Sequence, residues 1–259
     1  MSLAIRFSNV HKRFRRTRVL DGLDMDVPQG AIYALVGANG AGKTTSIRVL
    51  MNILRADSGS AEVLGTDSRR LGPDHFRTIG HVSENQEMPE WMTVGYFLEY
   101  LKPFYPTWDD AWATELIRRF RLPLDRRLKD LSRGMKMKAA LASSLAFHPK
   151  LLVLDEPFGG LDPIVREDLV EGLLECAGDN AMTILISSHD LAEIESFASH
   201  VGYLDEGRLQ FSEELATLSA RFREVEVTLP EAPTTPPPTQ TWPEAWIRES
   251  NEPPPLCGS

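Results

Sequence analysis

Gly37-Ala38-Asn39-Gly40-Ala41-Gly42-Lys43-Thr44 is the stretch of this sequence that decides its fold. It matches the phosphate-binding pattern G-x-x-x-x-G-K-[ST]. Glycines allow backbone N–H groups to converge on phosphate oxygens without clashes from Cβ atoms, and Lys43 adds a positive charge. The Thr44 hydroxyl is a suitable ligand for Mg²⁺. The stretch therefore predicts a nucleotide site with the contacts Gly37, Asn39, Gly40, Ala41, Gly42, Lys43, Thr44 and Thr45.

The residues on either side of this loop have the pattern that a phosphate-binding loop requires. Residues 31–36 form a short apolar run, which predicts a buried strand ending at Gly37. Apolar residues at helical spacing then predict a helix over about residues 43–54, with its positive end toward the phosphates. Residues 3–7 and 23–27 alternate in part, as strands of an edge sheet do.

A second apolar run, residues 151–154, ends in the carboxylates of Asp155 and Glu156. Asp155 is predicted to hold Mg²⁺ through water, and Glu156 to polarise the water that attacks the nucleotide. Residues 183–186 predict another buried strand, and a helix near 164–177 separates the two runs. Strands that alternate with helices predict an α/β fold with a largely parallel sheet.

The middle of the chain predicts a helical subdomain over about residues 87–135. Residues 96–101 and 109–120 have helical character, with aromatic residues scattered between prolines. The apolar residues near the start of this segment are Trp91, Met92 and Val94. They leave two interpretations open, a surface that receives a partner protein or ordinary core packing.

The last residues differ from the rest of the chain. Nine of the 18 prolines lie in residues 230–259, a density that disfavours helix and sheet. We expect residues 1–229 to form one domain and residues 230–259 to form a flexible tail. A docking segment is the alternative, because Trp242 and Trp246 lie four residues apart.

Composition excludes several classes of protein. The formal net charge of -9 argues against a nucleic-acid binder, which needs clustered positive charge. The two cysteines match neither a metal motif nor a disulfide scaffold, which favours a reducing, intracellular setting. We find no signal-peptide pattern and no apolar run near the roughly 20 residues that span a bilayer. A membrane role would therefore require a partner chain.

The stretch Leu131-Ser132-Arg133-Gly134-Met135 resembles the signature sequence L-S-G-G-Q of ATP-binding-cassette (ABC) transporters. The phosphate-binding loop, this signature, Asp155-Glu156, Gly160-Leu161-Asp162 and Ser188-His189 follow in the family's order and at its spacings. The resemblance covers about residues 3–215. It implies a P-loop NTPase cassette with a mostly parallel sheet core, an antiparallel β subdomain and a helical subdomain.

The resemblance also implies a mechanism in which two such subunits close over two ATP molecules. Ser132 and Gly134 of one subunit would contact the γ-phosphate held by the other, and Asp162 would lie at the seam. His189 would bridge the γ-phosphate and Glu156, and would act with Lys43 and Glu156 in catalysis. Phe14 lies where the family places an aromatic ring under adenine, although core packing is an alternative for it.

The sequence also departs from the family. Arg133 replaces the first glycine of the signature, Met135 replaces glutamine, and Gly159 stands where serine is frequent. In residues 79–84 the family usually ends on a glutamine that touches Mg²⁺, whereas this chain has Glu84, with Gln86 two residues later. Our hypothesis is that Glu84 takes the role of that glutamine as a metal ligand beside Thr44 and Asp155. Gln86 is the alternative.

The sequence therefore predicts an ATP-binding, ATP-hydrolysing subunit of an ABC transporter with the cofactors ATP and Mg²⁺. The expected partners are a transmembrane permease subunit and a second ABC ATPase subunit, identical or similar, and no nucleic acid. The expected location is the cytoplasmic face of the cell membrane. The signature variants resemble bacterial export-type subunits. A non-transport ABC ATPase, regulatory or related to translation or repair, is the alternative.

Overall fold

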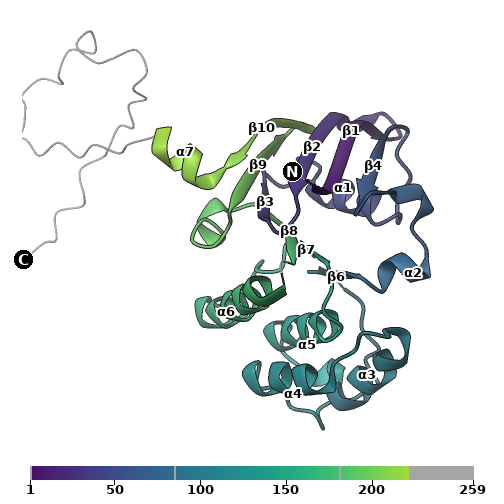
Figure 1. Cartoon of the computed structure of the whole chain (residues 1–259), viewed down its shortest axis with the longest axis vertical. Coiled ribbons are helices and arrows are strands. Elements are labelled where there is room, and N and C mark those ends of the chain that lie inside the picture. Colours follow the sequence, from purple (N-terminus) through teal and green to yellow (C-terminus); the bar gives the residue numbers. More distant parts are fainter. Residues whose placement is uncertain (1, 85, 181, 222–259) are drawn as a thin grey trace, which may run out of the picture. The chain divides into compact units, whose positions relative to one another are not determined.

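The fold contains two β-sheets, and the larger one includes the strands that precede the phosphate-binding loop and the Asp155-Glu156 pair (Figure 1). The computed structural model of the chain describes residues 2–84, 86–180 and 182–221, so the predicted boundary at residue 229 and the tail 230–259 lie outside the described residues. In the described part, this sheet has six strands in the order β10-β9-β3-β8-β7-β6. They are β3 (Ile32–Val36), β6 (Ile79–Ser83), β7 (Leu151–Asp155), β8 (Thr183–Ser188), β9 (His200–Asp205) and β10 (Arg208–Glu214). All neighbours pair in parallel except β10 with β9, which confirms the predicted largely parallel sheet.

The second sheet is antiparallel, with the order β2-β1-β4-β5. Its strands are β1 (Leu3–Phe14), β2 (Thr17–Pro28), β4 (Ser58–Val63) and β5 (Thr66–Asp67). Along β1, Ile5 and Phe7 are buried while Arg6 and Ser8 are exposed, as expected for a strand with one face on a core. β1 and β2 are longer than the predicted 3–7 and 23–27, because they continue to pair as far as a tight hairpin at Phe14 and Thr17.

The central strands separate two hydrophobic cores. Leu151 and Val153 of β7 belong to the core under the antiparallel sheet, whereas Leu152 and Leu154 belong to the core under the helices. Successive side chains of a strand point to opposite faces, so a continuous apolar run can fill both cores. This explains why β7 has no polar face before it reaches Asp155.

Seven α-helices and four 3-10 helices lie in the described residues, and the predicted segment 87–135 contains α3, α4 and the start of α5. The α-helices are α1 (Lys43–Leu50), α2 (Pro73–Phe76), α3 (Val94–Leu101), α4 (Asp110–Arg119), α5 (Arg133–Leu145), α6 (Pro163–Asn180) and α7 (Leu215–Arg221). The 3-10 helices are η1 (Ser68–Arg70), η2 (Lys102–Phe104), η3 (Leu128–Asp130) and η4 (Leu191–Glu193). The subdomain helices α3, α4 and α5 each begin after a side chain that accepts a backbone N–H, which stabilises their first turns. Helix α5 continues beyond residue 135 and packs against β6.

The helix after the phosphate-binding loop is shorter than predicted. It ends at Leu50 rather than near residue 54. Asn52 adopts a left-handed conformation with φ 56°, and the N–H of Ile53 and of Leu54 both donate to the carbonyl of Arg48. A left-handed residue is a common way to end a helix. None of the described helices combines the length and the apolar character that spanning a bilayer requires.

Candidate nucleotide-binding site

The phosphate-binding loop joins the end of β3 to the start of α1. Gly42 precedes the helix with φ 114°, and a Cβ atom there would lie 2.8 Å from the carbonyl oxygen of Val19. Only glycine tolerates both conditions. No side chain caps α1 and no acidic residue occupies its first turn, so the N–H groups of that turn are available to an anion.

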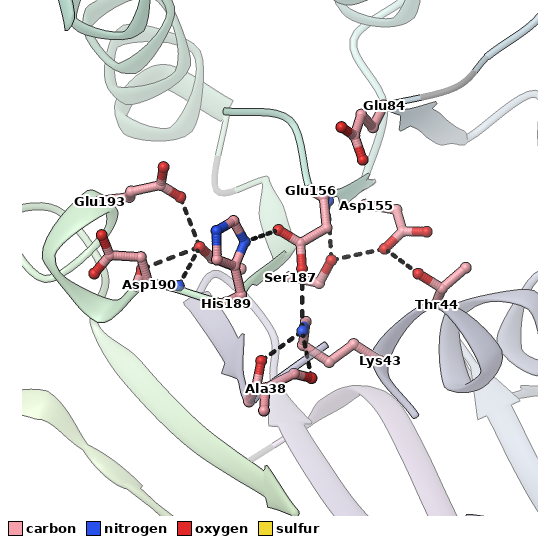
Figure 2. A network of polar contacts seen from close by, with 12 residues as sticks. Ala38, Lys43, Thr44, Glu84, Asp155, Glu156, Ser187, His189, Asp190 and Glu193 are labelled. Carbon is pink, nitrogen blue, oxygen red and sulfur yellow. Dashed lines mark hydrogen bonds and ion pairs between the residues drawn. The ribbon is translucent and has the colours of Figure 1, made fainter. Parts of the chain in front are cut away.

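Lys43 points back across this loop and is only 5% exposed. Its Nζ donates to the carbonyl oxygens of Gly37 at 2.5 Å and Ala38 at 3.2 Å (Figure 2). The same Nζ lies 3.1 Å from Oε1 of Glu156. A buried ammonium needs such compensation. The predicted cation of the phosphate site is therefore held between the loop and the carboxylate predicted to activate water.

Asp155 and Thr44 meet at the end of β7. The Thr44 hydroxyl donates to Oδ1 of Asp155 at 3.1 Å, and the Ser187 hydroxyl donates to the same oxygen at 2.7 Å. A carboxylate beside a hydroxyl is a set of hard oxygen donors of the kind that Mg²⁺ takes, so these residues fit the predicted metal. Thr45 is half-buried one residue further along α1.

Sequence reasoning missed Ser187, although it links both carboxylate residues. Its side chain is fully buried, and its oxygen accepts the backbone N–H of Glu156 at 3.0 Å while donating to Asp155. The parallel register places Ser187 directly opposite Asp155. The sequence shows that residues 183–188 form a strand, but only the register of that strand against β7 reveals this contact.

Glu156 lies at the centre of the polar network in Figure 2. One carboxylate oxygen faces Lys43, and the other lies 2.9 Å from Nδ1 of His189. The hydrogen bond and the negative charge of Glu156 raise the pKa of His189 above its ordinary value of 6.5. Glu156 also has a φ of 50°, a left-handed conformation that costs a non-glycine residue about 1–3 kcal/mol. Such strain persists where surrounding contacts hold it, as Ser187 does here.

Glu84 follows β6 directly, and its backbone N–H donates to the carbonyl of Asp155 at 2.9 Å. Its carboxylate forms an ion pair with Arg133, at the start of α5. Gln86 turns back to its own strand end, where its side-chain oxygen accepts the N–H of Ser83 at 3.4 Å. Glu84 is therefore attached to the strand end beside Asp155, and its side chain has a partner that sequence reasoning did not foresee.

Four predicted site residues outside the phosphate-binding loop and α1 do not belong to the polar network drawn in Figure 2, namely Phe14, Ser132, Gly134 and Asp162. Phe14 is 45% exposed at the end of β1, which excludes core packing, and Nζ of Lys12 lies over its ring at 5.7 Å from the centroid. Ser132 is exposed and its side chain caps α5, whereas Gly134 is buried against Val165. Asp162 is exposed, and its carboxylate accepts the N–H of Val165 at the start of α6.

The apolar residues near the start of the helical subdomain divide between the two interpretations. Met92 and Val94 are buried in the core, so their assignment to an exposed surface is wrong. Trp91 is 66% exposed and packs against Tyr96 of α3 with ring centroids 5.8 Å apart. The buried pair anchors the segment, and the tryptophan remains on the surface.

Comparison with known proteins identifies the family to which this site belongs. Residues 20–159, more than half of the chain, match the family model described as ABC transporter. This chain is an ABC transporter protein. The lantibiotic transport ATP-binding protein SrtF of Streptococcus pyogenes is 33% identical over 213 residues, which cover 81% of this chain and 90% of that protein. The bacitracin transport ATP-binding protein BcrA of Enterococcus faecalis is 30% identical over 225 residues, covering 86% and 73%.

Solved structures show the same fold for this ABC protein. A structure described as the ATP binding subunit of an ABC transporter superposes with a TM-score of 0.75 at 26% identity, covering 85% of this chain and 93% of that chain. The predicted cassette fold is confirmed. The chain is an ATP-binding and ATP-hydrolysing subunit of an ABC transporter, and the non-transport alternative is not favoured.

Proposed function

We propose that this ABC subunit hydrolyses Mg·ATP at the network around Glu156 and drives export through a separate membrane permease at the cytoplasmic membrane face. The observation that carries the proposal is the position of Glu156 between Lys43 and His189, beside the Asp155–Thr44 pair. SrtF and BcrA are named as transport proteins for lantibiotics and bacitracin. Their names support export as the direction of transport and suggest a peptide antibiotic as substrate.

The residues have distinct roles in this reaction. The loop N–H groups and Lys43 hold the phosphates, so Lys43 exchanges its present carbonyl partners for phosphate oxygens. Glu156 accepts a hydrogen bond from the attacking water and takes its proton, while the water oxygen bonds to the γ-phosphorus and ADP leaves. His189 orients Glu156 and donates to the γ-phosphate. Phe14 offers its exposed ring to adenine.

Thr44 and Asp155 would hold Mg²⁺, and Glu84 would join them in the role of the family's glutamine. The ion, when bound, offsets the negative charge of the phosphates. Ser187 keeps the Asp155 carboxylate oriented toward this site through its hydrogen bond of 2.7 Å. Loss of this positioning in a Ser187 variant would weaken both the metal site and the water-activating residue.

A second ABC subunit would complete the site. Ser132 is exposed at the start of α5, so its hydroxyl and the first N–H groups of that helix can reach a phosphate held by another subunit. Gly134 is buried, so it contributes through its backbone. Asp162 is exposed at the start of α6 and would lie at the seam between the subunits.

The exposed aromatic side chains of the helical subdomain would receive the permease. Tyr96 and Tyr100 lie on the exposed face of α3, and Trp91 and Phe104 pack against them. Large exposed aromatic side chains that lie together on one surface suit an apolar segment of another protein.

ATP-dependent dimerisation tests the catalytic part of this proposal. Wild-type protein and Glu156→Gln are compared by size-exclusion chromatography with ATP, alongside phosphate release. We expect the variant to form a stable dimer and its turnover to fall about 100- to 10,000-fold, the usual contribution of a general base. Turnover at the wild-type rate in Glu156→Gln would refute the role of that residue.

Export and partner binding need a test in cells. Cells that depend on this chain for resistance to bacitracin or a lantibiotic should become sensitive when it carries Glu156→Gln. Trp91→Ala with Tyr96→Ala should abolish resistance and co-purification of the permease while leaving the ATPase of the isolated subunit intact. Phe211→Ala is the matched control, because Phe211 stacks on Tyr203 in an exposed pair elsewhere. Antibiotic accumulation that falls when the chain is inactivated would indicate uptake instead.

A further inference from the structure

Two departures from the family's usual sequence meet in the fold. Glu84 replaces a glutamine and Arg133 replaces a glycine, 49 residues apart in the chain, and their side chains form an ion pair. Glu84 is attached to the end of β6 and Arg133 is the first residue of α5. The pair therefore links the strand end beside the ATP site to the helix that begins after the signature serine.

Two glycines of the loop after Glu156 lie against this pair: Gly160, which the family shares, and Gly159, which is a third departure. A Cβ atom on Gly160 would lie 2.7 Å from Nη1 of Arg133, too close for any larger residue unless the guanidinium moved. Gly160 also has a φ of 65°, a left-handed conformation that favours glycine. A Cβ on Gly159, where the family often has serine, would lie 3.2 Å from Oε1 of Glu84. The guanidinium thus lies over the loop that follows Glu156.

The charge of Glu84 explains why a cation is needed here. Ser83 lies opposite Asp155 across adjacent parallel strands, whose spacing is about 4.8 Å, so Glu84 and Glu156 are the next residues at the same sheet edge. Three carboxylates at the end of two strands would repel one another and the phosphates of ATP. Lys43 already offsets Glu156. Arg133 is the cation paired with Glu84 in the described residues.

We propose that Arg133 is a positioning residue of the ATP site, which neutralises Glu84 and holds its carboxylate at the end of β6. The substituted glutamine, the substituted glycine and the glycine pair after Glu156 then form one functional unit. The proposal rests on the ATP site described above. It predicts that the effects of changing Glu84 and Arg133 are coupled.

A double-mutant cycle on nucleotide affinity tests this coupling. Binding of fluorescently labelled ATP is measured in EDTA, where neither Mg²⁺ nor turnover contributes. We expect Arg133→Gln to weaken binding about 3- to 10-fold, because Glu84 is left uncompensated near the phosphates. Glu84→Gln should bind as well as wild type or better. The double variant should return to within about twofold of wild type, since the surplus charge is gone.

Matched controls separate the pair from general effects. Lys136→Ala also removes one positive charge from the first turn of α5 and should leave ATP affinity unchanged. Arg133→Lys keeps the positive charge and should retain most of the ATP affinity. Thermal melting confirms that each variant is folded, and Arg133→Met, which also removes the charge, replaces Arg133→Gln if the latter unfolds. Lys43→Ala shows whether the ATP site itself is correct, because it must lose binding. Wild-type affinity in Arg133→Gln, or a double variant as weak as Arg133→Gln, would overturn the proposal.

Discussion

Ser187→Ala is the most informative single change to the ATP site, because it touches no nucleotide. The hydroxyl donates to Asp155 at 2.7 Å and accepts the N–H of Glu156 at 3.0 Å, and it is fully buried. Alanine removes both contacts and leaves the Glu156 N–H without this acceptor. The strained φ of 50° at Glu156 then loses one of the contacts that hold it.

The magnitude follows from these two hydrogen bonds. A bond to a charged carboxylate contributes about 1.5–3 kcal/mol and a neutral bond about 0.5–1.5 kcal/mol. The free energy of unfolding should therefore fall by about 2–4 kcal/mol, a large fraction of the roughly 5–15 kcal/mol typical of a protein. For a domain of this size, the midpoint of thermal unfolding should drop by about 4–16 °C.

Urea unfolding followed by circular dichroism, together with phosphate release, measures both consequences. We expect ATP turnover to fall by about tenfold, because Asp155 and Glu156 lose their common positioning contact. The matched control is Ser143→Ala, a buried serine of α5 whose hydroxyl donates to the carbonyl of Ala140 at 2.8 Å. A loss of stability in Ser187→Ala no greater than in this control would refute the reasoning.

Three further changes test other parts of the protein. Glu156→Gln should bring the pKa of His189 back down toward 6.5, which histidine NMR titration measures. In the wild type, the stabilisation from the raised pKa of His189 is present just below pH 6.5 and is lost as pH rises through that raised pKa. No change in that titration would contradict the contact. Gly42→Ala should abolish ATP binding or folding, since it combines φ 114° with a clash against a backbone carbonyl, whereas Gly72→Ala, which meets open space, should fold normally. Burial lowers the pKa of His81, so the free energy of unfolding should fall as pH drops below 6.5 and through the lowered pKa. His81→Gln should reduce this pH dependence in urea unfolding experiments. An unchanged dependence of the free energy of unfolding on pH would exclude His81 as its source.

Local patterns in the sequence were sufficient for the class of fold and for the phosphate-binding loop. The loop residues 37–44 are contiguous, and their chemistry depends on backbone freedom and helix start, which neighbouring residues determine. The apolar runs of β3, β7 and β8 needed no knowledge of distant contacts, because strands buried on both faces are continuous in sequence. The end of α1 was misplaced because Asn52 stops the helix through its left-handed conformation, which its identity does not require.

Only the tertiary structure decided which side chains meet across the sheet and across its edge. The register of β8 against β7 brings Ser187 to Asp155, and a shift by one residue would turn it to the other face. The same is true of Glu84 and Arg133, which sequence shows as two separate departures and the fold joins as one ion pair. The sequence by itself shows which residue types stand at each strand end and helix start. The packing of β6, β7 and α5 decides which of these side chains contact one another. Contacts between distant residues depend on strand register and helix position, and no local pattern specifies either.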